Sequence, residues 1–126
     1  MSTHFFPTPG TVVNASAMVL DHVDVPAEQQ LDGSPTTATA VLGELAGEDA
    51  APLELGVWEM TAGTMSDVEA DEVFIVLSGA ATVEIAAFGG QPATVLAPVA
   101  GDVVQLREGM RTVWTVTETF RKIYLA

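Results

Sequence analysis

The chain has 126 residues, a hydrophobic fraction of 48%, no cysteine and a formal net charge of -13. This length fits one domain that buries a core without covalent staples. The lack of cysteine excludes disulfides, thiolate metal sites and a cysteine nucleophile, and the acidic balance argues against nucleic acid or an anionic membrane as a partner.

The N-terminal part of the chain has little periodicity. Residues 1–50 are rich in Pro, Gly, Ser and Thr, and we interpret them as an N-terminal arm followed by the first strands. Asp32-Gly33-Ser34-Pro35 predicts a turn, Thr36 to Leu42 a short strand, and Glu44 to Pro52 an acidic loop or a single helical turn. No basic segment followed by an apolar run opens the chain, so we expect no signal peptide and a cytoplasmic location.

From Leu53 onward, short strand-like segments alternate with turn residues. The predicted strands are Leu53 to Met60, Glu72 to Leu77, Ala81 to Ala87, Thr94 to Leu96, Asp102 to Leu106, Thr112 to Val116 and Arg121 to Leu125. A parallel α/β fold needs helical patterns between its strands, and these are absent. The spacing therefore predicts an all-β sandwich or barrel.

Two glycine-anchored segments resemble the signature motifs of the cupin superfamily. In the first, six residues separate Glu72 from Gly79, and the second runs from Gly101 to Gly109. The resemblance implies a double-stranded β-helix, which is a jelly-roll-like barrel. Metal-binding cupins carry histidines in these motifs.

The matching histidine positions here are Ser66, Val68 and Thr112, and the chain's two histidines, His4 and His22, lie upstream of both motifs. We therefore expect no metal and no other cofactor, with an atypical divalent metal left open.

Longer stretches resemble the cupin subfamily that contains the (S)-ureidoglycine aminohydrolases and an ethanolamine-utilisation cupin. They are residues 56–63, 71–74, 101–104 and 109–124. The resemblance covers roughly residues 53–125 and implies a homodimer. The resemblance does not carry the hydrolase activity across. It implies for that enzyme a manganese site built from Glu, two His and Gln, and at most Glu72 of these ligands is kept here.

Glu72 is the residue that we expect to be catalytic if the protein is an enzyme. Side chains alternate across a strand, so Glu72, Phe74 and Val76 share one face, which the resemblance points into the barrel. A carboxylate among apolar side chains needs a partner. Glu72 is either a ligand anchor or acid–base group, or a structural carboxylate bonded to backbone or to an arginine.

The other expected pocket residues are aromatic or basic. Thr112 and Trp114 share one face, and Trp114 is either a wall for a planar ligand or core packing with its N–H satisfied. The same ambiguity holds for Trp58, and Tyr124 is either a pocket hydroxyl or a rim residue.

Arg107 and Arg111 flank the turn at Gly109. Three interpretations of these arginines are open: they hold a small anionic ligand, they form salt bridges with the abundant acidic residues, or they contact a second subunit. By contrast, Arg121 and Lys122 point to opposite faces of their strand and do not form one patch.

The acidic run at Asp67, Glu69, Asp71 and Glu72 has the oxygen ligands that hard cations prefer. Strand alternation sets the first three opposite Glu72, so a solvated loop is the preferred interpretation.

Together these features predict a single cupin domain over residues 1–126, with the barrel core over residues 51–126. The expected function is the binding of an unknown small molecule without the usual histidine ligands. Two alternatives stay open: an aminohydrolase-like enzyme acting on a small ureide or carboxylate, and a structural barrel without a ligand.

Overall fold

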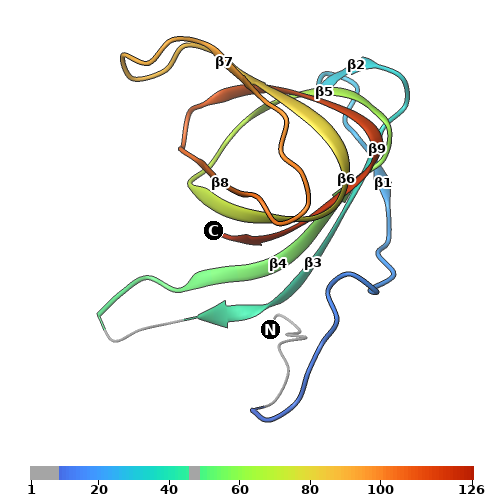
Figure 1. Ribbon diagram of the computed structural model, residues 1–126, viewed down its shortest axis with the longest axis vertical. Coiled ribbons are helices and arrows are strands. Elements are labelled where there is room, and N and C mark those ends of the chain that lie inside the picture. The colour runs from blue at the N-terminus through green and yellow to red at the C-terminus, as the bar shows by residue number, and fades with distance from the viewer. Residues whose placement is uncertain (1–8, 46–48) are drawn as a thin grey trace.

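A computed structural model describes residues 9–45 and 49–126, and all regular elements in these two ranges are β-strands. The strands are β1 (Val23–Asp24), β2 (Gln30–Asp32), β3 (Thr36–Leu45), β4 (Leu53–Met60), β5 (Gly63–Val68), β6 (Glu72–Ile85), β7 (Thr94–Leu96), β8 (Val103–Leu106) and β9 (Arg111–Leu125). Within the described ranges, no helix has the length and apolarity that a bilayer crossing requires. The predicted all-β fold is confirmed, and Figure 1 shows the strands curling into a barrel.

The barrel is one hydrogen-bonded sheet that divides into two halves. The β4 half-sheet consists of β1, β3, β4, the C-terminal half of β9, the N-terminal half of β6, and β8. The β5 half-sheet consists of β2, β5, the N-terminal half of β9, the C-terminal half of β6, and β7. Strands β6 and β9 therefore run through both halves and join them, as Figure 1 shows.

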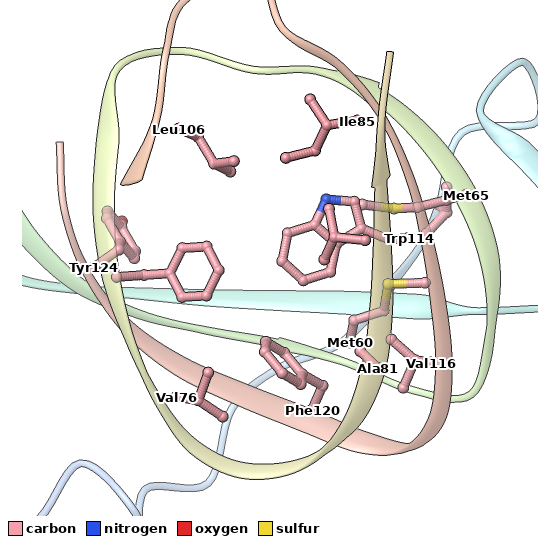
Figure 2. Close-up of a cluster of buried hydrophobic side chains, with 13 residues drawn as sticks. Met60, Met65, Val76, Ala81, Ile85, Leu106, Trp114, Val116, Phe120 and Tyr124 are labelled. Carbon is pink, nitrogen blue, oxygen red and sulfur yellow. The ribbon is translucent and has the colours of Figure 1, made fainter. Parts of the chain in front are cut away.

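Strand alternation fills the barrel with apolar side chains from both halves. The buried cluster contains Val25, Met60, Met65, Phe74, Val76, Ala81, Val83, Ile85, Leu106, Trp114, Val116, Phe120 and Tyr124. Figure 2 shows Trp114 near the middle of this cluster, with Met60, Met65 and Phe120 around it. Burial of this apolar surface is the main term that stabilises the barrel.

The structure joins two pairs of predicted strands. Glu72 to Leu77 and Ala81 to Ala87 belong to the single strand β6, and Thr112 to Val116 and Arg121 to Leu125 belong to β9. Gly79, interpreted as the end of a strand, instead lies in an irregular stretch of the β6–β9 ladder with φ of +95°. A Cβ atom there would overlap the Thr119 carbonyl, so this bend depends on glycine.

Two other expectations about local structure are wrong. No strand was predicted between Met60 and Glu72, but Gly63–Val68 form β5, which pairs with both β2 and β9. Glu44 was predicted in a loop, yet β3 continues to Leu45 and pairs there with Leu53 of β4. The remainder of that predicted loop includes residues 46–48, which lie outside the described residues.

The N-terminal arm packs on the outer face of the β4 half-sheet. Arg121 donates a hydrogen bond from Nη1 to the Ala15 carbonyl at 2.8 Å and pairs with Glu59 at 2.9 Å. His22 contacts the same carboxylate through Nε2 at 2.6 Å and Thr36 Oγ1 through Nδ1 at 2.9 Å. Residues 14–22 are therefore fastened to the barrel by polar contacts.

Candidate functional site

The inner face of the β4 half-sheet carries a buried charge at Lys122. This residue is 4% exposed and lies opposite Trp58 on β4 and Val76 on β6. Its Nζ lies 2.6 Å from Glu72 Oε2. The ion pair gives each charge a partner, which a buried ammonium or carboxylate requires.

Three aromatic rings surround the same ammonium and form what we call the aromatic cage. Lys122 Nζ lies 4.6 Å from the ring centroid of Trp58, 4.3 Å from that of Phe74 and 5.0 Å from that of Trp114. These distances are within the range of about 6 Å in which a ring face attracts a cation. The cage therefore holds a cation that the chain itself supplies.

A cavity of about 250 Å³ lies beside the Lys122–Glu72 pair. It is lined by Thr39, Trp58, Met65, Asp67, Glu69, Glu72, Trp114, Lys122 and Tyr124. Among the predicted site residues, Glu72, Trp58, Trp114 and Tyr124 are in this lining, and Phe74 contacts the ammonium from the core. The structure thus brings these five residues together.

The acidic run is arranged differently from the prediction. Strand β5 ends at Val68 and β6 begins at Glu72, so the chain reverses between them, and Asp67, Glu69 and Glu72 line the same cavity. The prediction was wrong because it extended strand alternation across this turn. Asp71 alone of the four faces outward, where its Oδ1 accepts a hydrogen bond from the Glu108 amide at 2.9 Å.

Glu69 fixes two side chains that project inward from β9. Its Oε2 accepts hydrogen bonds from Thr112 Oγ1 at 2.6 Å and from Trp114 Nε1 at 3.2 Å. Both donors are almost fully buried. Trp114 is therefore core packing with a satisfied N–H, and it also contributes to the wall of the cavity.

Asp67 lies in an environment that disfavours its charged form. Burial is the main cause that raises the pKa of this carboxyl above its ordinary value of 3.8, and the nearby Glu69 charge raises it further. A hydrogen bond from the Val68 amide to Oδ1 at 2.8 Å acts in the opposite direction. Among the residues that line the cavity, Asp67 is thus a group suited to hold a proton.

Tyr124 is held in place by two features of β4. Its hydroxyl donates to Glu54 Oε2 at 2.7 Å, and the ring lies where a side chain at Gly56 would overlap it. Burial and the bond to Glu54 raise the pKa of Tyr124 well above its ordinary value. The hydroxyl therefore stays protonated and keeps a fixed orientation at the edge of the cavity.

The predicted arginines do not reach this cavity. Arg111 instead lines a broad groove of about 1080 Å³ that extends over β5, β7 and the adjoining parts of β6 and β9. Thr112 also contributes to this groove, and Asp67 lines both the groove and the cavity. Arg107 is exposed in the turn before β9. The structure therefore separates both guanidinium groups from Glu72 and the aromatic cage.

The donor set does not fit a histidine-ligated metal. Ser66 and Val68 lie on β5, Val68 is 59% exposed, and Thr112 is bonded to Glu69. His22 is on the outer face with Glu59, and His4 is outside the described residues. In residues 9–45 and 49–126, no group of three or more His, Cys, Asp or Glu side chains is arranged to hold a metal ion.

Sequence reasoning missed the three charged lining residues Asp67, Glu69 and Lys122, and also Thr39 and Met65. A signal for Lys122 was present, because it has the same parity along the strand as Thr112 and Trp114 and must share their inward face if β9 is continuous. No comparable signal exists for Glu69, since its position depends on the turn between β5 and β6.

Comparison with known proteins identifies the domain type. A family model described as the EutQ-like cupin domain matches residues 47–124. No curated protein matches the chain.

Solved structures share the fold at low sequence identity. A protein of unknown function from Pseudomonas syringae, assigned to the DUF861 family, is 22% identical with a TM-score of 0.66 over 90% of this chain. That match covers 46% of the Pseudomonas protein, so the present chain spans about half of its length. The EutQ protein of Clostridium difficile is 24% identical with a TM-score of 0.51, over 82% of this chain and 79% of its own.

A cupin superfamily protein from Desulfitobacterium hafniense is 12% identical with a TM-score of 0.58, and the match covers 100% of this chain and 97% of that protein. At these identities the neighbours support the fold, whereas the activity has to be argued from the pocket.

Proposed function

The chain belongs to the family of EutQ-like cupin domains, and from that premise we propose that its pocket binds a small organic molecule rich in hydrogen-bond donors, such as an amine, an amide or a ureide. The observation that carries this proposal is the excess of acceptor oxygens around the cavity. Three carboxylates, those of Asp67, Glu69 and Glu72, line it together with the single ammonium of Lys122.

Each of the three carboxylates has one oxygen to spare. The described contacts use Oδ1 of Asp67, Oε2 of Glu69 and Oε2 of Glu72. In the described ranges, no fully buried side-chain nitrogen or oxygen lacks a partner, so the second oxygens are open to solvent. A ligand that displaces this solvent has to donate hydrogen bonds to them.

The size of the cavity limits the ligand. Its volume of about 250 Å³ is below the range of about 300–1,000 Å³ that is usual for drug-sized molecules. The rings of Trp58 and Trp114, which are tilted by 58° to one another, supply apolar surface on one side. A molecule of a few heavy atoms with several N–H groups matches both the size and the polarity.

The enzyme alternative is an aminohydrolase-like reaction with Glu72 as acid–base group. The 2.6 Å contact with Lys122 favours an anchoring role, because one oxygen of Glu72 is already held by a buried ammonium that needs it as a partner. The alternative of a structural barrel without a ligand is disfavoured by the open cavity. We therefore place binding before catalysis.

A panel of matched small probes tests the proposal. We expect methylguanidinium and methylurea to raise the melting temperature and to bind in isothermal titration calorimetry, and acetate of similar size to do neither. Asp67→Asn should weaken binding of the cationic probe, because it removes a carboxylate from the lining. Glu118→Gln is the matched control, since Glu118 is exposed and lines neither the cavity nor the groove beside Arg111.

Two outcomes would overturn the proposal. Tighter binding of acetate than of methylguanidinium would make Lys122 the anchor of an anionic ligand. Absence of binding by any probe would favour the structural barrel. Glu72→Gln alone does not separate the roles, because it also leaves Lys122 without its partner.

A further inference from the structure

The chain has a single lysine, and this lysine lies inside the barrel. The other three basic residues are Arg107, Arg111 and Arg121, so Lys122 carries the only side-chain amine in 126 residues. It is 4% exposed. An arginine supplies a permanent charge, whereas a lysine amine that has lost its proton also attacks carbonyl carbon. The one amine is therefore placed where its chemistry, and not only its charge, is available to a ligand.

The cavity gives a small molecule access to this amine. Lys122 lines the cavity, and so does Thr39 of β3, which is exposed and places one side of the cavity at the surface. Within residues 9–45 and 49–126, the only hydrogen-bond partner of Nζ is Glu72. The other close neighbours of Nζ are the rings of the aromatic cage, and the N–H of Trp114 is already donated to Glu69. No donor therefore occupies the nitrogen lone pair once the proton has left.

Glu72 is placed to exchange that proton. A lysine is nucleophilic only as the neutral amine, and an adjacent base activates it. Oε2 of Glu72 lies 2.6 Å from Nζ, which is within the range for direct proton transfer. This role is compatible with the anchoring contact, because the proton is exchanged with the same amine that Glu72 already holds.

Charge selects the kind of electrophile that suits this amine. An acyl donor would convert Lys122 to a neutral amide, and carbon dioxide would convert it to an anionic carbamate. Either product would leave Glu72 without a cation in a cavity that Asp67 and Glu69 also line. An aldehyde gives a protonated imine, whose positive charge keeps both the carboxylate and the aromatic rings as partners.

We propose that Lys122 captures a small aldehyde as a Schiff base. Glu72 accepts a proton from the ammonium, and the nitrogen lone pair forms a bond to the aldehyde carbon while the carbonyl π electrons move to oxygen. A proton then passes from nitrogen to that oxygen. Glu72 returns its proton to the hydroxyl, which leaves as water while the C=N bond forms. One water is released for each aldehyde bound, and the carboxylate is restored.

The lining limits the aldehyde to a short, uncharged one with a hydrogen-bond donor. The cavity has a volume of about 250 Å³, and its three carboxylates repel an anionic oxo acid such as glyoxylate. Their spare oxygens accept a hydrogen bond from a hydroxyl or amide group. Glycolaldehyde has a hydroxyl beside its carbonyl and is the probe. This class rests on the acceptor-rich pocket of the proposed function, but capture does not require methylguanidinium to bind, so the two proposals fail separately.

Reductive trapping on the full, untagged chain tests the proposal. The protein is incubated at pH 7 with glycolaldehyde and cyanoborohydride, which reduces an imine to a stable secondary amine, and mass spectrometry locates the label. The only other primary amine is the α-amino group, which ordinarily loses its proton at lower pH than a lysine and so reacts first. We expect the folded protein to be labelled at Lys122 at least tenfold faster than at the α-amino group, and the order to reverse in urea.

A size-matched anion and a variant without the amine are the controls. Relative to the α-amino group, glyoxylate should label Lys122 at least tenfold more slowly than glycolaldehyde does. Lys122→Met combined with Glu72→Gln removes both charges and should take label only at the α-amino group, with circular dichroism as the check that it is folded.

Three outcomes would overturn the proposal. A folded native protein labelled only at the α-amino group would make Lys122 a purely structural charge. Equal rates at Lys122 in folded and urea-unfolded protein would show that the pocket does not activate the amine. Labelling by glyoxylate as fast as by glycolaldehyde would contradict the selection of an uncharged aldehyde.

Discussion

The two half-sheets of this barrel share two strands but distribute polarity in opposite ways. In the β5 half-sheet, threonines such as Thr115 face outward and Trp114 and Val116 face the core. In the β4 half-sheet, the charged Lys122 faces inward and its neighbour Ile123 faces outward. Both patterns occur along the single strand β9.

This difference shows that the two half-sheets do not share one pattern of inward and outward side chains. The β5 half-sheet has the usual pattern of a sheet with one solvent-exposed face, with apolar side chains inside and polar side chains outside. The β4 half-sheet carries the Lys122–Glu72 ion pair and the cavity on its inner side and aliphatic side chains such as Ile75 and Ile123 on its outer side, so it departs from this pattern on both faces. The substitutions below test this contrast, from the largest expected effect to the smallest.

Gly79 lies where β6 passes from one half-sheet to the other, and its replacement should have the largest effect. We expect Gly79→Ala to lower the free energy of unfolding by about 4 kcal/mol, because the added Cβ overlaps the backbone at Thr119 and φ is +95°. Urea denaturation measures the loss.

Gly90→Ala is the control for Gly79→Ala. Gly90 has φ of +82° and open space around it, so we expect a loss of about 1 kcal/mol. Equal losses for the two variants would mean that the bend tolerates a side chain.

Removal of the charge inside the β4 half-sheet should come next. Lys122→Met leaves Glu72 without its partner, and we expect a loss of about 3 kcal/mol in denaturant unfolding. The double variant Lys122→Met with Glu72→Gln should recover most of that loss, because it removes both charges. A single variant that costs less than about 1 kcal/mol would show that solvent replaces the ion pair.

A threonine pair on β9 compares the inside and the outside of the β5 half-sheet. Thr112→Val removes the hydrogen bond to Glu69 and should cost about 2 kcal/mol, since bonds to charged groups are the stronger ones. Thr115→Val on the outer face should change stability by less than about 0.5 kcal/mol. The reverse order of the two losses would contradict the assigned faces.

The smallest effect concerns the dependence of stability on pH. Burial raises the pKa of Asp67 in the folded state above 3.8, so the folded state holds this proton more tightly than the unfolded state. The associated stability is present at low pH and is lost as pH rises from 3.8 through the pKa of the folded state.

We therefore expect the unfolding free energy of the native protein, minus that of Asp67→Asn, to fall with rising pH above 3.8 and then to level off. The difference is obtained from denaturation curves of both proteins at several pH values. A flat difference would mean that the environment of Asp67 does not disfavour its charge.

Much of the fold was predictable from the sequence. The bounds of Leu53–Met60 and Thr94–Leu96 match the prediction, because aliphatic and β-branched residues there are bounded by Gly or Pro. The continuity of β6 was not predictable, because a glycine such as Gly79 is equally consistent with the end of a strand and with a bend within one. Only pairing with β9 distinguishes the two.

The site was predictable only in part, for a related reason. The placement of Glu72, Phe74 and Trp114 follows from alternation within β6 and within β9, once the cupin resemblance indicates which face points inward. Glu69 reaches the cavity through a turn, and Lys122 is recognised as inward only if β9 is continuous over 15 residues. A lysine on an inward face contradicts the usual apolar pattern, and only the aromatic cage and Glu72 explain it.

The passage of β6 and β9 through both half-sheets also has a consequence for folding kinetics. Their pairing joins Ile85 to Thr112 and Val73 to Leu125, which are separated by 27 and 52 positions in the chain. Neither half-sheet has its β6–β9 pairing until these distant segments meet. The slow closure of long loops therefore precedes most of the stabilising contacts. The barrel should therefore fold in milliseconds to seconds as one cooperative unit, with no half that forms first.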